Sequence, residues 1–353
     1  MSEKIHAIVV GASGYVGGEL LRLLASHGEF ELSAAVSDTL AGTPIGQHFA
    51  TLTHCYPEQH FVSMEAVLDA LGEQPRLAVF SAAPHGASAG VIAAILKAAK
   101  RKSIDVHVVD SSADFRYTDA DSFKSVYGID HLAPDLLDQF SCVLPEHALS
   151  ATTPHIGHPG CFATASLLAA VPLFTANLAE PEIFISGITG STGSGRHASA
   201  GTHHPERHSN LYAYKPLAHR HTPEIVKLID NASDQQVAVN FVPHSGPYAR
   251  GIYITLQANL ACDIREDDVR QVYRDYYSDS IFTQVVDGMP RLKDVVASNY
   301  CHIGIATEGH RVVVMSAIDN LVKGAAGGAM QWMNRLWSLP ETSGLKTPAP
   351  AWT

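Results

Sequence analysis

The chain has 353 residues, 24 basic and 35 acidic side chains, and a formal net charge of −11. This length exceeds a typical single domain of ~100–200 residues, so we expect two domains. No run of lysine or arginine is long enough to follow a phosphate backbone, which argues against a nucleic-acid partner.

The first residues run directly into an apolar alternation, Ile5 to Val10, without a basic region, a signal-length apolar segment or a span of ~20 apolar residues. We therefore expect a cytoplasmic protein with no membrane partner. The five cysteines are scattered and show no CxxC spacing. Their odd number and spacing favour reduced thiols over a disulfide framework or a zinc site.

Strands alternate with helices through the first half of the chain. The predicted strands are 4–10, 31–37, 76–81 and 105–110, and the predicted helices are an apolar pattern around Leu20 to Leu24, then 64–71 and 87–101. This alternation predicts an α/β Rossmann-type, doubly wound parallel sheet with helices on both faces.

The pattern changes near residues 151–158. A long helix (164–173) is followed by a strand (182–187), a Gly/Ser/His-rich loop, a helix after Thr222, strands 237–242 and 251–259, a helix 266–277, a strand 311–317 and a helix from 320 to about 337. Consecutive strands beside a few helices predict a second domain of the α+β class.

A glycine-rich loop separates the first strand from the first helix. It contains the candidate nucleotide-binding residues Gly11, Ser13, Gly14, Tyr15 and Val16. Glycines allow a tight turn and close backbone approach, and a helix N-terminus attracts a pyrophosphate. The spacing GxxGxxG differs from GxGxxG, and the alternative is a turn that binds nothing, but the strand before and the helix after favour a dinucleotide site.

The end of the second strand leaves the cofactor choice open. An acidic residue here, Asp38, would hold the ribose 2′-hydroxyl of NAD and repel the 2′-phosphate of NADP. Alternatively, Asp38 turns into solvent and leaves Ser37 and Thr39 facing the phosphate.

Cys161 follows Gly160 at the start of an apolar helix. The helix dipole and the backbone N–H groups at this position lower a thiol pKa and can stabilise an oxyanion. Cys161 is therefore a candidate nucleophile. The alternative is a small apolar residue packed at a helix start, as cysteines often are.

Two histidines, His219 and His221, directly precede a helix with the start signals Thr222 and Pro223. Either histidine is a candidate general acid and base, and Glu224 is available to orient it. Six histidines lie between His197 and His221, but no HExxH or carboxylate spacing accompanies them, so we predict no metal site.

Two further loops contain candidate phosphate or cofactor ligands. Ser112 and Arg116 follow the strand 105–110, where ligands of parallel sheets bind, although an Asp–Arg pair that only shapes this loop is the alternative. The loop Gly190 to Arg196 includes Ser191 and Gly193, whose backbone can approach a cofactor if the segment is not simply a flexible turn.

The whole chain resembles the N-acetyl-gamma-glutamyl-phosphate reductase family. The blocks described above occur in the same order as in that family, and so do Leu144-Pro145-Glu146, Tyr214-Lys215 and the segment from Asp319-Asn320 to Gly327. That family is related to aspartate-semialdehyde dehydrogenase. The resemblance implies NADP(H), a small-molecule acyl phosphate substrate and a homodimer or homotetramer. It also implies a Rossmann-type domain formed by 1–158 and 318–353, and a catalytic and oligomerisation domain at 159–317.

The resemblance further implies site residues. Cys161 would be the nucleophile, His221 rather than His219 the acid and base, and Asn320 a contact of the nicotinamide, with Arg116 and Arg250 as substrate anchors. The implied reaction reduces N-acetyl-gamma-glutamyl phosphate to the semialdehyde through a thioester. The alternatives are an N-succinylglutamyl, aspartyl or carrier-bound aminoadipyl phosphate as substrate, or a nucleotide-sensing module without turnover.

The chain differs from the commoner family pattern in two places. No basic residue follows the second strand, which bears on the choice between NADP and NAD, and the loop 203–210 is rich in histidine, which bears on the acyl group.

Overall fold

A computed structural model describes residues 4–72 and 75–351 of the chain. The chain divides into two compact units, Met1–His158 with Ala325–Lys346, and Pro159–Gly324 with Thr347–Thr353. The segments 318–324 and 347–351, which the sequence-based division assigns to the first domain, lie in the second unit. The outermost residues of that division, 1–3 and 352–353, lie outside the described residues.

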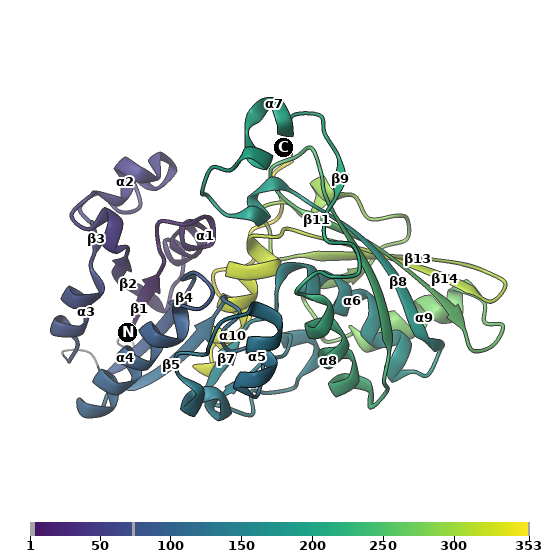
Figure 1. The fold of residues 1–353 in the computed structure, drawn as a ribbon, viewed down its shortest axis with the longest axis horizontal. Helices are drawn as coiled ribbons and strands as arrows, with labels where there is room; N and C mark the ends of the chain where they lie inside the picture. Colours follow the sequence, from purple (N-terminus) through teal and green to yellow (C-terminus); the bar gives the residue numbers. More distant parts are fainter. Residues whose placement is uncertain (1–3, 73–74, 352–353) are drawn as a thin grey trace. The chain divides into compact units, whose positions relative to one another are not determined.

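The first unit contains a seven-stranded sheet in the order β3-β2-β1-β4-β5-β7-β6 (Figure 1), in which every pairing is parallel. Strand β1 is apolar along most of its length, which fits its central position in the sheet, because a strand that is covered by helices on both faces has no side exposed to solvent. The strands are β1 Ile5–Val10, β2 Phe30–Val36, β3 Phe61–Val62, β4 Arg76–Ser81, β5 Asp105–Asp110, β6 Phe140–Ser141 and β7 His155–Gly157.

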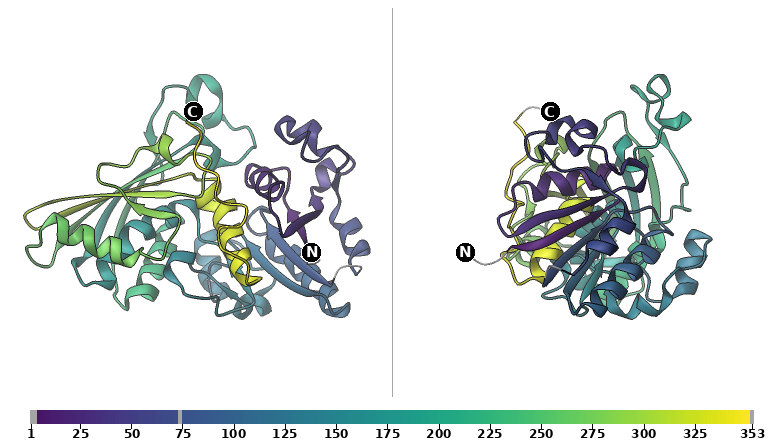
Figure 2. Two further views of the ribbon diagram at one scale, coloured as in Figure 1. Left: turned by 180° about the vertical axis from the view of Figure 1, so that it is seen from behind. Right: turned by 90° about the vertical axis from the view of Figure 1, so that its left-hand side faces the viewer.

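Helices cover both faces of this sheet (Figures 1 and 2). The helices α1 and α10 pack on one another and against β2 and β5, whereas α3 and α4 pack around the buried core residues Ile8, Val10 and Val79. The helices are α1 Tyr15–Leu24, α2 Ile45–His48, α3 Met64–Ala70, α4 Ser88–Arg101, α5 Ala120–Tyr127 and α10 Gly327–Leu336. The predicted doubly wound parallel sheet is confirmed.

The second unit contains a mixed seven-stranded sheet in the order β12-β13-β14-β11-β8-β10-β9. The helices α6, α8 and α9 pack on one face of it (Figure 1). The elements are α6 Cys161–Thr175, β8 Ala179–Thr189, α7 His204–Arg207, β9 Tyr212–Ala213, α8 Thr222–Ser233, β10 Ala238–Ser245, β11 Ile252–Leu260, α9 Glu266–Tyr276, β12 Thr283–Val285, β13 Cys301–Glu308 and β14 Arg311–Ile318. The predicted α+β class is also confirmed.

Helix α6 is the core of this unit. Its residues from Phe162 to Phe174 are all buried, because the helix is apolar around its whole circumference rather than along one stripe. The helix starts at Cys161, three residues before the predicted start at residue 164. Cys161 therefore occupies the first helical position.

The predicted helix from 320 to 337 is two segments in the structure. A π-helical turn, Val322–Ala326, precedes α10. The carboxylate of Asp319 accepts the backbone N–H groups of Leu321 and Val322 (2.8 and 2.9 Å) and so organises this turn. Across residues 4–72 and 75–351, no helix has both the length and the apolar character needed to cross a membrane.

Candidate active site

The glycine loop of the first unit can accept a dinucleotide phosphate. Gly11 has a left-handed φ of +70°, and a Cβ on it would lie 2.5 Å from the carbonyl oxygen of Ala82. A Cβ on Gly17 would collide with the Gly11 carbonyl oxygen. Helix α1 begins after Gly14 without a side-chain cap, so its first N–H groups point beyond the helix end. These features fit a pyrophosphate at the helix N-terminus.

Three hydroxyl groups gather beside this loop. The Ser13 and Ser37 Oγ atoms are 2.9 Å apart, and Thr39 Oγ1 lies 3.3 Å from Ser37 Oγ. The carboxylate of Asp38 accepts the backbone N–H of Met64 at the start of α3 (2.8 Å). The Asp38 carboxylate is exposed and is held toward α3 by this contact.

The candidate ligands Ser112 and Arg116 are hydrogen-bonded within the first unit. Ser112 Oγ donates to buried Asp110 (2.6 Å), and Arg116 donates to the carbonyls of His158 (3.0 Å) and Ser111 (3.2 Å). Burial raises the pKa of Asp110 to about 6, although Ser112 and Ser88 donate hydrogen bonds to it. Ser112 and Arg116 therefore shape the loop after β5 through side-chain contacts.

The candidate nucleophile Cys161 lies at the N-terminus of α6. The residue before it, Gly160, donates its N–H to the buried carboxylate of Glu224 (2.6 Å) and accepts the N–H of Thr164 (2.7 Å). Gly324 allows close packing on the other side, because a Cβ there would lie 2.8 Å from the Cys161 Cβ. The backbone before Cys161 and the Cβ of Cys161 are thus held from two directions. Glu224, predicted to orient a histidine, holds the backbone next to the nucleophile.

His219 and His221 lie together, with ring centroids 4.7 Å apart. Both are buried, and the His219 ring contacts Phe162, Phe241 and Tyr214 edge-on. His219 Nδ1 accepts the backbone N–H of His221 (3.1 Å), so the neutral ring carries its proton on Nε2. Burial first, then Arg220 and Lys215, lower the pKa of His219 to about 4, which keeps this ring neutral near pH 7.

One pocket in the second unit, of about 400 Å³, brings the nucleophile and both histidines together. Of the residues singled out from the sequence, it contains Cys161, His219, His221 and Gly193. Ser194, which also lines it, belongs to the predicted cofactor loop 190–196. No role was predicted for the other lining residues, which are Phe162, Thr189, Tyr212, Tyr214, Lys215, Arg220 and Ser245. Lys215 and Arg220 lie close to His219 and His221 in the sequence. Basic residues next to candidate catalytic histidines are the sequence signal that could have identified these two as residues of the site.

Asn320 and Arg250 organise neighbouring loops of the same unit. Asn320 accepts the N–H of Gly251 (2.7 Å) and donates to Thr192 Oγ1 (3.0 Å) in the loop that contains Ser191 and Gly193. Arg250, a predicted substrate anchor, forms a two-pronged ion pair with buried Asp319 (3.0 and 3.1 Å). Its guanidinium is thus directed to a protein carboxylate.

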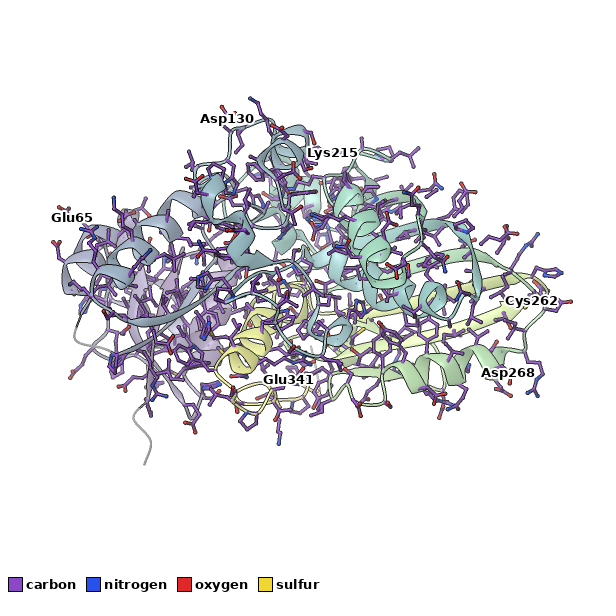
Figure 3. The ribbon with its side chains drawn as sticks, turned by 90° about the horizontal axis from the view of Figure 1, so that it is seen from below. Glu65, Asp130, Lys215, Cys262, Asp268 and Glu341 are labelled. Carbon is purple, nitrogen blue, oxygen red and sulfur yellow. The ribbon has the colours of Figure 1, made fainter. Side chains whose placement is uncertain are left out.

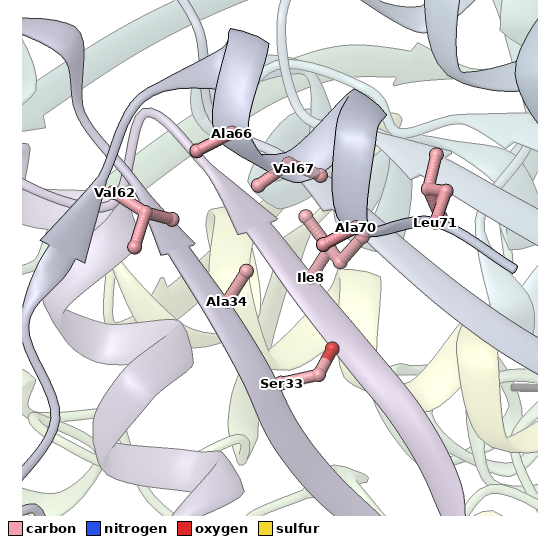
Figure 4. Close-up of a pocket in the computed structure, with 8 residues that line it drawn as sticks. All are labelled: Ile8, Ser33, Ala34, Val62, Ala66, Val67, Ala70 and Leu71. Atoms are coloured by element: carbon pink, nitrogen blue, oxygen red, sulfur yellow. The ribbon is translucent and has the colours of Figure 1, made fainter. Parts of the chain in front are cut away.

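A second hollow lies in the first unit beneath α3 (Figure 4). It is lined by Ile8, Ser33, Ala34, Val62, Ala66, Val67, Ala70 and Leu71. Its walls are aliphatic apart from Ser33, whose hydroxyl donates to the Ala7 carbonyl (3.0 Å). The hollow opens to the surface of the unit, since Ser33, Ala66 and Ala70 are exposed. Among the side chains that the structure describes, no group of three or more His, Cys, Asp or Glu is placed to hold a metal ion.

Two family descriptions match the two units. "Semialdehyde dehydrogenase, NAD binding domain" matches residues 6–140, and "Semialdehyde dehydrogenase, dimerisation domain" matches residues 161–320. The fold agrees with two aspartate semialdehyde dehydrogenases of known structure, each 16% identical. The Vibrio cholerae enzyme II has a TM-score of 0.69 and the Candida albicans enzyme with NADP a TM-score of 0.66, with 95% of this chain and 99% of theirs covered in both cases.

The first unit has a sheet of the dinucleotide-binding type, and the second has a cysteine at a helix start beside two histidines. Together with the two family matches, these features assign the chain to the semialdehyde dehydrogenase class. The chain is 40% identical over 346 residues to the N-acetyl-gamma-glutamyl-phosphate reductase of Methanopyrus kandleri, covering 96% of this chain and 97% of the relative. It is 38% identical to the same enzyme of Methanosarcina mazei, covering 99% and 100%. The chain belongs to the N-acetyl-gamma-glutamyl-phosphate reductase family.

Proposed function

We propose that the protein reduces N-acetyl-gamma-glutamyl phosphate to N-acetylglutamate semialdehyde and phosphate, with NADPH as reductant, in arginine biosynthesis. The observation that carries this proposal is the single pocket in which Cys161, at the first position of α6, lies with His219 and His221. The names of the relatives supply the acyl group.

Cys161 begins the proposed reaction as a thiolate that attacks the acyl carbon. A sulfur–carbon bond forms, the carbon–oxygen bond to phosphate breaks, and a thioester remains. The N–H groups of the first turn of α6 are suited to stabilise the oxyanion that forms in this step. Glu224 supports the geometry through Gly160, since its carboxylate fixes the peptide that precedes Cys161.

The histidines hold and move the proton. The neutral His219 ring can donate a hydrogen bond from Nε2 but contributes no positive charge near pH 7. We therefore assign the general acid and base to His221. It would protonate the oxygen of the thiohemiacetal that forms when the thioester is reduced, and take that proton back as the carbon–sulfur bond breaks to release the aldehyde and the Cys161 thiolate. When bound, the nicotinamide supplies the hydride that reduces the thioester.

The first unit contains the residues that would hold the dinucleotide. Gly11, Gly14, Tyr15 and Val16 present the start of α1 to the pyrophosphate. The hydroxyls of Ser13, Ser37 and Thr39 are suited to the 2′-phosphate of NADP, while Asp38 is engaged by the Met64 N–H. In the second unit we assign Ser191, Gly193 and Asn320 to the nicotinamide end.

Three further predicted residues act in this proposal through the loops that they hold. Ser112 and Arg116 fix the loop after β5, and Arg250 fixes the turn at Asp319. Their predicted role as substrate contacts stays part of the proposal beside these loop contacts.

The proposed assembly is a homodimer or homotetramer formed through the sheet of the second unit. On β8, buried Ile183 and Ile185 alternate with Phe184, whose exposed fraction is 54%. A large aromatic residue exposed in the middle of a strand is a feature of sheet surfaces that pack against a partner.

The reverse reaction gives a direct test. Purified protein is mixed with N-acetylglutamate semialdehyde, phosphate and either NADP or NAD, and the absorbance of reduced nicotinamide is followed. We expect a phosphate-dependent signal with NADP that is lost in Cys161→Ser and kept in Cys262→Ser, a control at an exposed thiol. Signal only with N-succinylglutamyl, aspartyl or aminoadipyl analogues would contradict the acyl group, and an active Cys161→Ser variant would contradict the covalent mechanism.

A further inference from the structure

The pocket around Cys161 has a cationic character that the residues assigned so far do not explain. Among the described residues that line it, Lys215 and Arg220 are cationic and none is acidic. The whole chain, by contrast, has a formal charge of −11. A local excess of positive charge in an acidic protein favours an anionic ligand at that place.

Lys215 is the cation of this pocket that has no protein partner. Within residues 4–72 and 75–351, its ammonium group makes no hydrogen bond and no ion pair, and the side chain is exposed at the surface of its unit (Figure 3). The arginines predicted as substrate anchors differ from it in this respect, since Arg116 is bonded to two carbonyls and Arg250 to Asp319.

The backbone holds Lys215 in an unusual conformation. Its φ is +44°, in the left-handed region that lysine rarely adopts, and such strain persists only where neighbouring structure maintains it. Hydrogen bonds to β10 supply that support on both sides. The N–H of Tyr214 donates to Pro243 (3.0 Å) and that of Leu217 to Phe241 (2.9 Å), so the turn is fixed against the sheet.

The neighbours of Lys215 place it near the reacting atoms. Burial and the nearby Cys161 raise the pKa of Tyr214, the residue directly before Lys215. Lys215 is also among the groups that lower the pKa of His219. Lys215 therefore lines the same pocket as Cys161 and both histidines, and its charge acts on His219.

We infer that Lys215 binds the phosphate group of the acyl phosphate substrate, and inorganic phosphate in the reverse reaction. This inference rests on the proposed function. The phosphate is attached directly to the carbon that the Cys161 sulfur attacks, whereas the substrate carboxylate is at the other end of the glutamyl chain. A cation beside the nucleophile and the histidines is consequently matched to phosphate, and it also stabilises the charge on phosphate as it leaves.

Steady-state kinetics of the reverse reaction test this role. We expect Lys215→Met to raise the KM for phosphate roughly tenfold or more, the loss typical of one hydrogen bond to a charged group, with the KM for the semialdehyde little changed. Lys215→Arg keeps the charge and should recover most of the phosphate affinity. Lys293→Met removes an exposed lysine of the same unit that does not line the pocket, and it should behave as wild type.

A second measurement does not depend on turnover. Iodoacetamide alkylates accessible thiolates, and phosphate bound beside Cys161 should slow its alkylation. The phosphate concentration that halves this rate should rise roughly tenfold in Lys215→Met. Equal phosphate protection and equal phosphate KM in wild type and Lys215→Met would overturn the inference, as would a rise confined to the semialdehyde KM. A wild-type protein that is protected by phosphate but inactive with the semialdehyde would instead contradict the proposed substrate.

Discussion

At the residue scale, the site depends on how buried polar groups use their hydrogen bonds. Glu224 is 1% exposed, and its carboxylate accepts the N–H of Gly160 next to the nucleophile. His219 uses Nδ1 as an acceptor for the His221 N–H. In both contacts a side chain of the histidine segment accepts a backbone N–H group, in one case next to the nucleophile. The same hydrogen bonds therefore fix the orientation of the side chains and the course of the backbone around the pocket.

Substitution of Glu224 separates two roles for its carboxylate. A glutamine side chain at this position would still accept the Gly160 N–H, so we expect Glu224→Gln to keep most of the stability and activity. Glu224→Ala leaves a buried N–H unsatisfied, at a cost of about 1–3 kcal/mol. For a unit of this size the melting temperature should fall by roughly 2–4 °C per kcal/mol, measured by calorimetry together with kcat. If the glutamine variant loses as much kcat as the alanine variant while staying stable, the negative charge acts on an imidazole instead.

The chemistry-bearing residues could be predicted from the sequence better than their contacts. Cys161, His219 and His221 stand at recognisable helix starts, and they line one pocket. The distant partners of Arg116 and Arg250 could not be predicted, because His158 and Asp319 are 42 and 69 residues away in the chain and reach them only through tertiary folding. Lys215 appeared in the sequence as part of a Tyr-Lys block without a role. Its significance depends on a strained turn, which no local pattern predicts.

At the element scale, long periodic segments could be predicted and short or irregular ones could not. The strands β6, β7 and β9 have two or three residues each, too few to show a period. Strand β13, Cys301–Glu308, was missing from the prediction although it has eight residues. Its Gly304 and its polar residues weaken the β signal, and it is buried because β14 and β12 pair with it on both sides.

The π-helical turn Val322–Ala326 bears directly on the nucleophile through Gly324. In Gly324→Ala the new Cβ would lie 2.8 Å from the Cys161 Cβ, so one of the two segments must move. A displacement of about 1 Å can reduce the rate about 100-fold, and we expect kcat to fall by roughly that factor. Gly288→Ala is the matched control, since no atom lies within 4 Å of the Cβ built there. A Gly324→Ala variant with wild-type kcat would show that the turn yields without disturbing the thiol.

At the scale of the whole molecule, the two units divide the proposed task. The first presents the glycine loop and the hydroxyl cluster, and the second contains the nucleophile, the histidines and Lys215. The alternation of strands and helices was sufficient to predict the fold class of the first unit, and the consecutive strands beside a few helices predicted that of the second. The surface proposed for assembly could not be located from the sequence. The exposed Phe184 is recognisable only when the burial of its neighbours on β8 is known.

The assembly proposal predicts that a charge at position 184 separates the subunits. Phe184→Glu places a carboxylate on the exposed side of β8, where burial against a second copy would desolvate it at a cost of several kcal/mol. The buried side chains Ile183 and Ile185 point to the other face, so the fold of the single chain should be kept. Sedimentation velocity should show the mass falling to that of one 37.8 kDa chain or of a smaller assembly. The control Leu149→Glu alters another exposed apolar residue, in the first unit, and should leave the mass unchanged. An undiminished mass in Phe184→Glu would place the subunit interface away from this face of the sheet.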